Sequence, residues 1–208
     1  QKDAPSVSDI TLGNVLRVTN EKMLWYEVLL PDGRKGYVRK QDARRVNQWL
    51  QEPQRKREAL VATARSFMGF PYLWGGTSAK GVDCSGFTKM IYWMHGIILQ
   101  RDASQQTLYG KEEPVKNEFA RLQAGDLLFF GQKATEEQEE RVTHVGMYIG
   151  NKEYIHAAGR VKINSLDPEA DNYSEYRHLS LVRVRRILGH LDEGGIAKVE
   201  AHPYYAGL

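Results

Sequence analysis

The sequence holds a single cysteine, Cys84, and six histidines, residue types that together form nucleophilic sites. With only one cysteine, no internal disulfide can form. Cys84 follows Asp83, a residue type favoured at helix N-caps, so we expect the cysteine at the first position of a helix. The helix dipole there should lower the pKa of the thiol and favour the reactive thiolate. A small buried side chain without chemistry is the alternative, and the position of Cys84 alone leaves both open.

Two histidines, His144 and His156, lie in segments that alternate in the manner of β-strands. The residues beside His144 that share the expected core face are Thr143, Val145, Met147 and Ile149, so the imidazole is expected to point away from that core. Gly150-Asn151 separates the two segments as a hairpin turn would. If paired residue numbers sum to an even value, both imidazoles share a face as opposite or diagonal neighbours. A register shift of one residue would separate them.

These residues suggest a nucleophile, a base and a residue that orients the base. His144 would take the thiol proton and later protonate the leaving amine, while His156 would hold the imidazole in the useful tautomer. A zinc site formed by Cys84 and both histidines is a rival, but the usual C-x-x-C or H-E-x-x-H spacing is missing. We therefore predict neither a metal nor another cofactor. His95, beside Gly96 at a helix end, is expected to be structural, since a cation there suits the dipole.

The elements that carry this chemistry indicate an α+β fold. Helical spacing from residue 58 predicts one helix that ends near Gly69, and a second helix runs from Asp83 to Gly96. Beyond Asp126 the pattern is that of strands, beginning with a continuous apolar run that fits burial on both faces. Helices first and strands later are typical of an α+β domain.

The first part of the chain has a different pattern. Short apolar runs around the turn signal Pro31-Asp32-Gly33-Arg34 predict a small β-barrel over residues 1–50, and this barrel could be incomplete at its N-terminal side. The polar stretch 47–57 is expected to link it to a second domain over residues 58–208.

Composition narrows the function classes. The 29 basic and 26 acidic residues leave a net charge of only +3, which does not favour nucleic acid as a partner. No run of about 18 apolar residues is present, so no membrane span is expected. The chain begins with Gln1 rather than Met, which suggests a processed product. The sequence does not indicate an oligomeric state.

Four segments in order resemble the NlpC-type family of cell-wall cysteine peptidases, and the likeness covers about residues 58–190. They are "DCSGF" from Asp83, "GDLLFF" from Gly125, "THVGMYIGN" from Thr143 and "YIHAAG" from Tyr154. The stretch "MLWYEVLLPDGRKGYV" from Met23 resembles the bacterial SH3-like domain that accompanies such enzymes. The resemblance implies a papain-like catalytic domain, with helices packed on an antiparallel sheet, after a small SH3-like β-barrel.

The resemblance also implies roles for individual residues. It assigns a Cys-His-His triad to Cys84, His144 and His156. Tyr72 would lie at the active site and help to stabilise the oxyanion with the Cys84 amide. Asp83 and Ser85 would hold the free amine and the D-glutamyl carboxylate, and Ser104 would line the substrate cleft.

The implied reaction is hydrolysis of the γ-D-glutamyl-L-diamino acid bond in peptidoglycan stem peptides. Relatives of that branch carry more SH3-like sequence than is visible here, so a need for a free N-terminal L-Ala stays open. A cell-wall-peptide binding module without turnover, or an amidase or acyltransferase with the same nucleophile, are the alternatives. Cell-wall peptides as partners imply a place outside the cytoplasm, with a cytoplasmic recycling enzyme as the alternative.

Overall fold

The computed structural model describes residues 5–51, 53–115, 119–191 and 194–205. The chain divides after residue 52 into two compact units. The predicted domain limits at residues 1 and 208, and Gln1 itself, lie outside the described residues.

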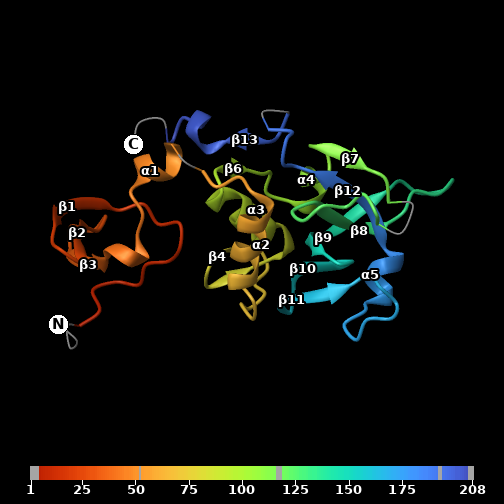
Figure 1. The fold of residues 1–208 in the computed structure, drawn as a ribbon, viewed down its shortest axis with the longest axis horizontal. Coiled ribbons are helices and arrows are strands. Elements are labelled where there is room, and N and C mark those ends of the chain that lie inside the picture. Colours follow the sequence, from red (N-terminus) through yellow and green to blue (C-terminus); the bar gives the residue numbers. More distant parts are fainter. Residues whose placement is uncertain (1–4, 52, 116–118, 192–193, 206–208) are drawn as a thin grey trace. The chain divides into compact units, whose positions relative to one another are not determined.

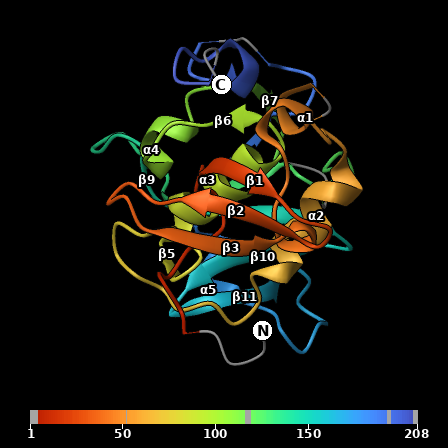
Figure 2. The same cartoon turned by 90° about the vertical axis from the view of Figure 1, so that its left-hand side faces the viewer.

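The first unit is built on an antiparallel sheet. Among residues 5–51 it contains strands β1 (Arg17–Glu21), β2 (Trp25–Leu29) and β3 (Lys35–Arg39), in the order β1-β2-β3 (Figure 2). The predicted turn between β2 and β3 is confirmed: Gly33 has a φ of +84°, and the Asp32 carboxylate accepts from the backbone N–H of Arg34. The strands fit the predicted small β-module, while its SH3-like character stays a prediction.

The segment after β3 differs from the predicted linker. A 3-10 turn (Lys40–Asp42) is followed by helix α1 (Val46–Gln51), so the polar stretch begins as a helix. The reason is visible in the spacing, because Val46, Trp49 and Leu50 recur at i, i+3 and i+4 and are all half-buried.

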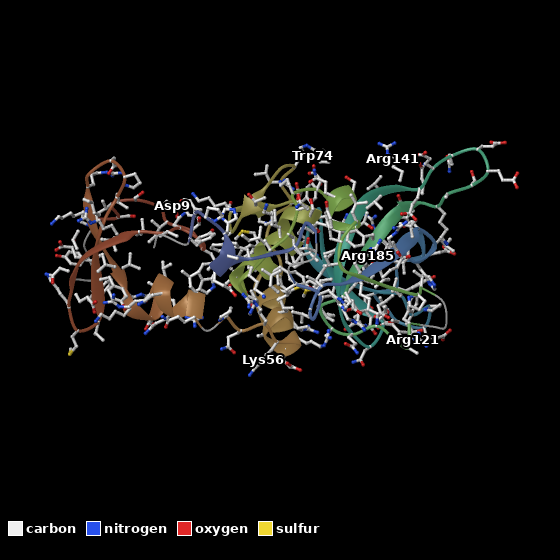
Figure 3. The ribbon with its side chains drawn as sticks, turned by 90° about the horizontal axis from the view of Figure 1, so that it is seen from above. Asp9, Lys56, Trp74, Arg121, Arg141 and Arg185 are labelled. Carbon is white, nitrogen blue, oxygen red and sulfur yellow. The ribbon has the colours of Figure 1, made fainter. Side chains whose placement is uncertain are left out.

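The second unit is organised around an antiparallel sheet with the strand order β11-β10-β9-β8-β12-β7 among the described residues (Figure 1). Its strands in chain order are β7 (Lys111–Glu113), β8 (Leu127–Gln132), β9 (Arg141–Gly150), β10 (Glu153–Ala158), β11 (Arg160–Ser165) and β12 (Leu181–Arg186). Residues 133–140 form an exposed loop between β8 and β9, and Arg141 lies at its base (Figure 3).

Helices pack against one face of this sheet, as an α+β domain requires. Helix α2 (Arg57–Ser66) buries Leu60 and Ala64, and helix α3 (Cys84–Met94) buries Phe87 and Ile91 against the same core. Both helices confirm the sequence prediction. Gly96, with a φ of +75°, follows α3 in a conformation that ends the helix. The short helices α4 (Ala103–Gln106) and α5 (Glu175–Leu179) were not predicted.

The sheet has a second core on its other face. The continuous run Leu127 to Phe130 is fully buried, which confirms that β8 is covered on both sides. The side chains of this second cluster are Leu122, Leu128, Phe130, Tyr148, Tyr154, Leu166, Leu181 and Val184. His144 lies on the opposite side of β9 from Val145 and Met147, as predicted, but the face that carries it is a core face as well.

Small paired elements complete the unit. Strand β4 (Thr77–Ser78) pairs with β5 (Gly81–Val82) just before α3, and β6 (Ile97–Ile98) pairs with β13 (Ala197–Lys198) just after it. The 3-10 turn Val199–Ala201 follows β13. Short strand pairs therefore flank both ends of α3, in segments where the sequence pattern predicts no strand.

Candidate active site

The head of helix α3 carries the cysteine. Asp83 is the N-cap, and its carboxylate accepts from the backbone N–H of Gly86 at 2.6 Å. Cys84 is then the first helical residue, as predicted. A Cβ on Gly86 would lie 2.0 Å from the carbonyl oxygen of Gly76, so only glycine lets this turn approach the preceding loop so closely.

The environment of the sulfur does not lower its pKa. Cys84 is 9% exposed, and burial raises the pKa of its thiol. Backbone N–H groups of Val145 and Ser85 partly offset the rise, whereas the neighbouring Asp83 charge adds to it. The expected low pKa was therefore wrong, because desolvation and a carboxylate outweigh the helix dipole. A raised pKa favours the protonated thiol at neutral pH.

The two histidines form a hydrogen-bonded pair. In the β9–β10 hairpin Tyr148 pairs with Tyr154 and Met147 with Ile155, so the paired numbers sum to an even value, which confirms the favourable register. His144 Nε2 lies 2.7 Å from His156 Nδ1, with the ring planes at 85°. Nδ1 of His144 makes no hydrogen bond to any residue that the structure describes.

Strand β9 brings this pair to the cysteine. The backbone N–H of Val145, the residue after His144, acts on the Cys84 sulfur and lowers the pKa of its thiol. Gly146 stands opposite His156, and a Cβ there would come within 3.2 Å of the His156 Cβ. The missing side chain of Gly146 therefore lets β10 approach β9 closely at the histidine pair.

Burial keeps both imidazoles neutral. His144 is 6% exposed and His156 is 1% exposed. Burial lowers the pKa of His144 well below its usual value, and the cations Arg177 and Lys162 lower it further. Burial likewise lowers the pKa of His156 to about 4, although the hydrogen bond to Asn164 opposes the shift. Neutral imidazoles can accept a proton, which a general base must do.

A second polar cluster lies beside the nucleophile. Arg101 reaches Asp83 with Nη2 at 2.6 Å from Oδ2 and Nη1 at 3.3 Å from Oδ1, and its Nη1 also donates to the Ser85 hydroxyl. Asp83 further accepts from the backbone N–H of Gly75. Burial alone would raise the pKa of Asp83, but the bonds from Arg101 and Gly86 hold it below its usual value. The predicted pair, Asp83 and Ser85, therefore lies together, and both side chains bind the guanidinium of Arg101.

The remaining predicted residues are placed differently. Tyr72 is half-buried; burial raises its pKa and the neighbouring Asp83 charge adds to the rise, so the hydroxyl stays protonated. Ser104 is exposed on α4, and its hydroxyl makes no hydrogen bond within the described part of the chain. The exposed Trp74, two residues after Tyr72, lies on the loop before the cysteine (Figure 3).

Two partners were missed by the sequence analysis. Arg101 is separated from Asp83 by 18 positions. Asn164, on the neighbouring strand β11, has its amide oxygen Oδ1 3.0 Å from His156 Nε2. The sequence analysis assigned no role to Arg101. The β10–β11 pairing could have pointed to Asn164, because it lies diagonal to His156 on the same face.

The described residues contain no cluster of three or more His, Cys, Asp or Glu side chains arranged to hold a metal ion. Among the same residues, every helix is too short or too polar to cross a bilayer.

The chain is similar in sequence to known proteins that are named as peptidases. A "Gamma-D-glutamyl-L-lysine dipeptidyl-peptidase" of Bacillus cereus is 38% identical over 149 residues, which are 72% of this chain and 43% of the relative. The protein of the same name in Bacillus subtilis is 40% identical over 121 residues, 58% of this chain and 37% of the relative. The chain thus matches less than half the length of either protein.

A solved structure and a family model agree with these relatives. The crystal structure of an NlpC/P60 family protein from Bacillus cereus superimposes with a TM-score of 0.68 and 35% identity, covering 86% of this chain and 55% of that one. Its likeness fits the predicted papain-like arrangement of sheet and helices. Residues 69–183, more than half of the chain, match the model of the NlpC/P60 family. On this match the chain belongs to the NlpC/P60 family.

Proposed function

We propose that this protein is a cysteine peptidase that hydrolyses peptide bonds of cell-wall peptides through Cys84, His144 and His156. The observation that carries the proposal is the hydrogen-bonded histidine pair, together with the backbone N–H of Val145, the residue after His144, which acts on the Cys84 sulfur. His144 keeps one ring nitrogen, Nδ1, free of the pair. Binding alone would need neither this pair nor a nucleophile at the head of a helix.

In this mechanism the proton moves as the sulfur attacks. The thiol is protonated and both imidazoles are neutral at rest, so His144 Nδ1 takes the thiol proton while the sulfur bonds to the carbonyl carbon. The resulting imidazolium then gives that proton to the leaving amine as the C–N bond breaks. Water, deprotonated by the same nitrogen, hydrolyses the acyl-enzyme and restores the thiol.

The oxyanion of each tetrahedral intermediate needs hydrogen-bond donors. We assign this role to the backbone N–H of Cys84 and to the hydroxyl of Tyr72. A raised pKa keeps the Tyr72 hydroxyl protonated and able to donate at neutral pH.

The bond we propose is the one between γ-D-glutamate and an L-diamino acid. The names of the two Bacillus relatives support it. Asp83, Ser85 and Arg101 form a charged cluster next to the nucleophile, and we assign to it the free amine and the carboxylate of an L-Ala-γ-D-Glu unit. Ser104 would line the other side of the cleft. The SH3-like character of residues 1–50 and a place outside the cytoplasm belong to the same proposal.

Digestion of a defined peptide tests the proposal. L-Ala-γ-D-Glu-diaminopimelate, with and without acetylation of the alanine amine, is incubated with wild type and with Cys84→Ala, and products are read by mass spectrometry. We expect cleavage after D-glutamate by wild type only, and circular dichroism should find both proteins folded. Full activity in the alanine variant would refute the proposal.

The same experiment separates the two alternatives. Tight binding of the peptide by wild type with no product over hours would identify a binding module. A product that carries an added amine, instead of a free D-glutamate carboxyl, would identify an acyltransferase.

A further inference from the structure

The hydrogen bonds of the histidine pair continue beyond His156. His156 Nε2 lies 3.0 Å from Oδ1 of Asn164 on β11, and Nδ2 of Asn164 donates to the backbone carbonyl of Asn172 at 2.9 Å. The same carbonyl accepts from the backbone N–H of Ser165 at 3.0 Å. A chain of bonds therefore runs from a backbone carbonyl, through one amide, to both imidazoles.

The carbonyl at the far end fixes the orientation of the amide. A carbonyl oxygen only accepts, so the NH₂ group of Asn164 has to face Asn172. The amide oxygen of Asn164 must then face His156, and because it also only accepts, His156 Nε2 has to carry a hydrogen.

The tautomer of His156 in turn determines which nitrogen of His144 carries the hydrogen. His156 is neutral, so with a hydrogen on Nε2 its Nδ1 has a lone pair and accepts from His144 Nε2. The hydrogen of neutral His144 is therefore on Nε2, and its Nδ1 holds a lone pair. The charged groups that act on the pair, Arg177 of α5 and Lys162 of β11, are both cations and favour these neutral forms.

We propose that Asn164 is a positioning residue that sets the tautomer of both imidazoles and so leaves His144 Nδ1 as the proton acceptor. This inference rests on the proposed function, since it names the residue that prepares the base of that reaction. Without the amide oxygen, His156 could carry its hydrogen on Nδ1. His144 would then accept at Nε2 and hold its hydrogen on Nδ1. That nitrogen could then not accept the thiol proton.

The ring nitrogens can be observed directly. Protein labelled with ¹⁵N-histidine is studied at pH 7.5 by two-bond ¹H–¹⁵N correlation spectra, which distinguish a protonated from an unprotonated ring nitrogen. In wild type we expect hydrogen on Nε2 of both His144 and His156. In Asn164→Leu, of similar volume but without an acceptor, we expect a mixture of tautomers and a fall in kcat/KM of about tenfold or more.

Two further variants separate positioning from packing. Asn164→Asp keeps an acceptor for His156 Nε2, so it should retain the wild-type tautomers and more activity than the leucine variant. Ser165→Ala removes the neighbouring buried hydroxyl, which bonds to the backbone N–H of Asp167, and should change neither signal. Neither substitution replaces a residue of the hairpin that carries the pair.

The outcomes are decided by the spectra and not by turnover alone. Hydrogen on Nδ1 of either ring in wild type, or wild-type tautomers in Asn164→Leu, would overturn the inference. If wild type cleaves no cell-wall peptide but holds both hydrogens on Nε2, the proposed function fails while the tautomer assignment stands.

Discussion

The unit that begins at Pro53 buries histidines in two places. The two places differ in how many ring nitrogens of the histidine make hydrogen bonds. At the end of α3, His95 uses both: Nε2 lies 2.8 Å from the Thr63 hydroxyl and Nδ1 lies 2.7 Å from the Gln54 carbonyl. In the sheet, His144 uses only Nε2, in the bond to His156. His95 is 7% exposed and His144 is 6% exposed, so burial does not separate the two sites.

The pKa does not separate them either. Burial lowers the pKa of His95, and the hydrogen bond to Gln54 offsets this only in part. The cation expected there from the helix dipole was therefore a wrong prediction, because desolvation outweighs the dipole. A buried, neutral histidine becomes a candidate base only where one nitrogen keeps a free lone pair next to an acidic proton.

The same substitution at both sites gives the largest contrast. His144→Leu removes the base, and we expect kcat to fall by a factor on the order of 10³, within the usual range for general base catalysis. It also leaves His156 Nδ1 without a partner, so some stability should be lost. Steady-state cleavage of the cell-wall peptide measures kcat, and turnover above a tenth of wild type would contradict the role of His144.

His95→Leu should affect stability and leave turnover within about twofold of wild type. The Gln54 carbonyl and the Thr63 hydroxyl lose their partner, which costs about 1 to 3 kcal/mol of unfolding free energy. Urea unfolding followed by circular dichroism measures that free energy. Because His144→Leu should cost a similar amount, turnover alone separates the two variants, and a large loss of activity in His95→Leu would remove the contrast.

The parts of this site that the sequence predicted are those fixed by short-range patterns. The cap at Asp83 follows from residue preference at a helix start, and the shared face of His144 and His156 follows from strand alternation across a short turn. Strand β7 could not be predicted in this way. It is a polar segment, Lys111–Glu113, held to β12 by Arg186, which bonds to Glu113 at 2.8 Å from far along the chain.

Electrostatic properties were the least predictable. The direction of the Cys84 pKa depends on how completely the sulfur is buried and on the Asp83 charge, and local sequence gives neither. Arg101 and Asn164 illustrate the same limit for contacts. Their types are ordinary for exposed positions, and only the packing of α4, β10 and β11 brings them to the nucleophile and the pair.

The smallest expected effect concerns Arg177, the cation that lowers the pKa of His144 most. The Arg177 guanidinium lies 5.6 Å from the centre of the Phe130 ring, which itself lies 5.8 Å from the His144 ring. Its charge lowers the pKa of both imidazoles, so Arg177→Gln should raise them. A base works only when unprotonated, so the acid limb of kcat/KM should move to higher pH while the plateau at higher pH is retained.

A pH series of kcat/KM at low ionic strength measures this shift, which added salt should reduce because it screens exposed charges. Arg160→Gln is the matched control: it removes an exposed cation of β11 that does not act on either imidazole, and the limb should stay in place. Lys162→Gln should move it in the same direction as Arg177→Gln. If the acid limb of kcat/KM stays at the same pH in both Arg177→Gln and Lys162→Gln, burial alone keeps the histidine pair neutral, as it does for His95.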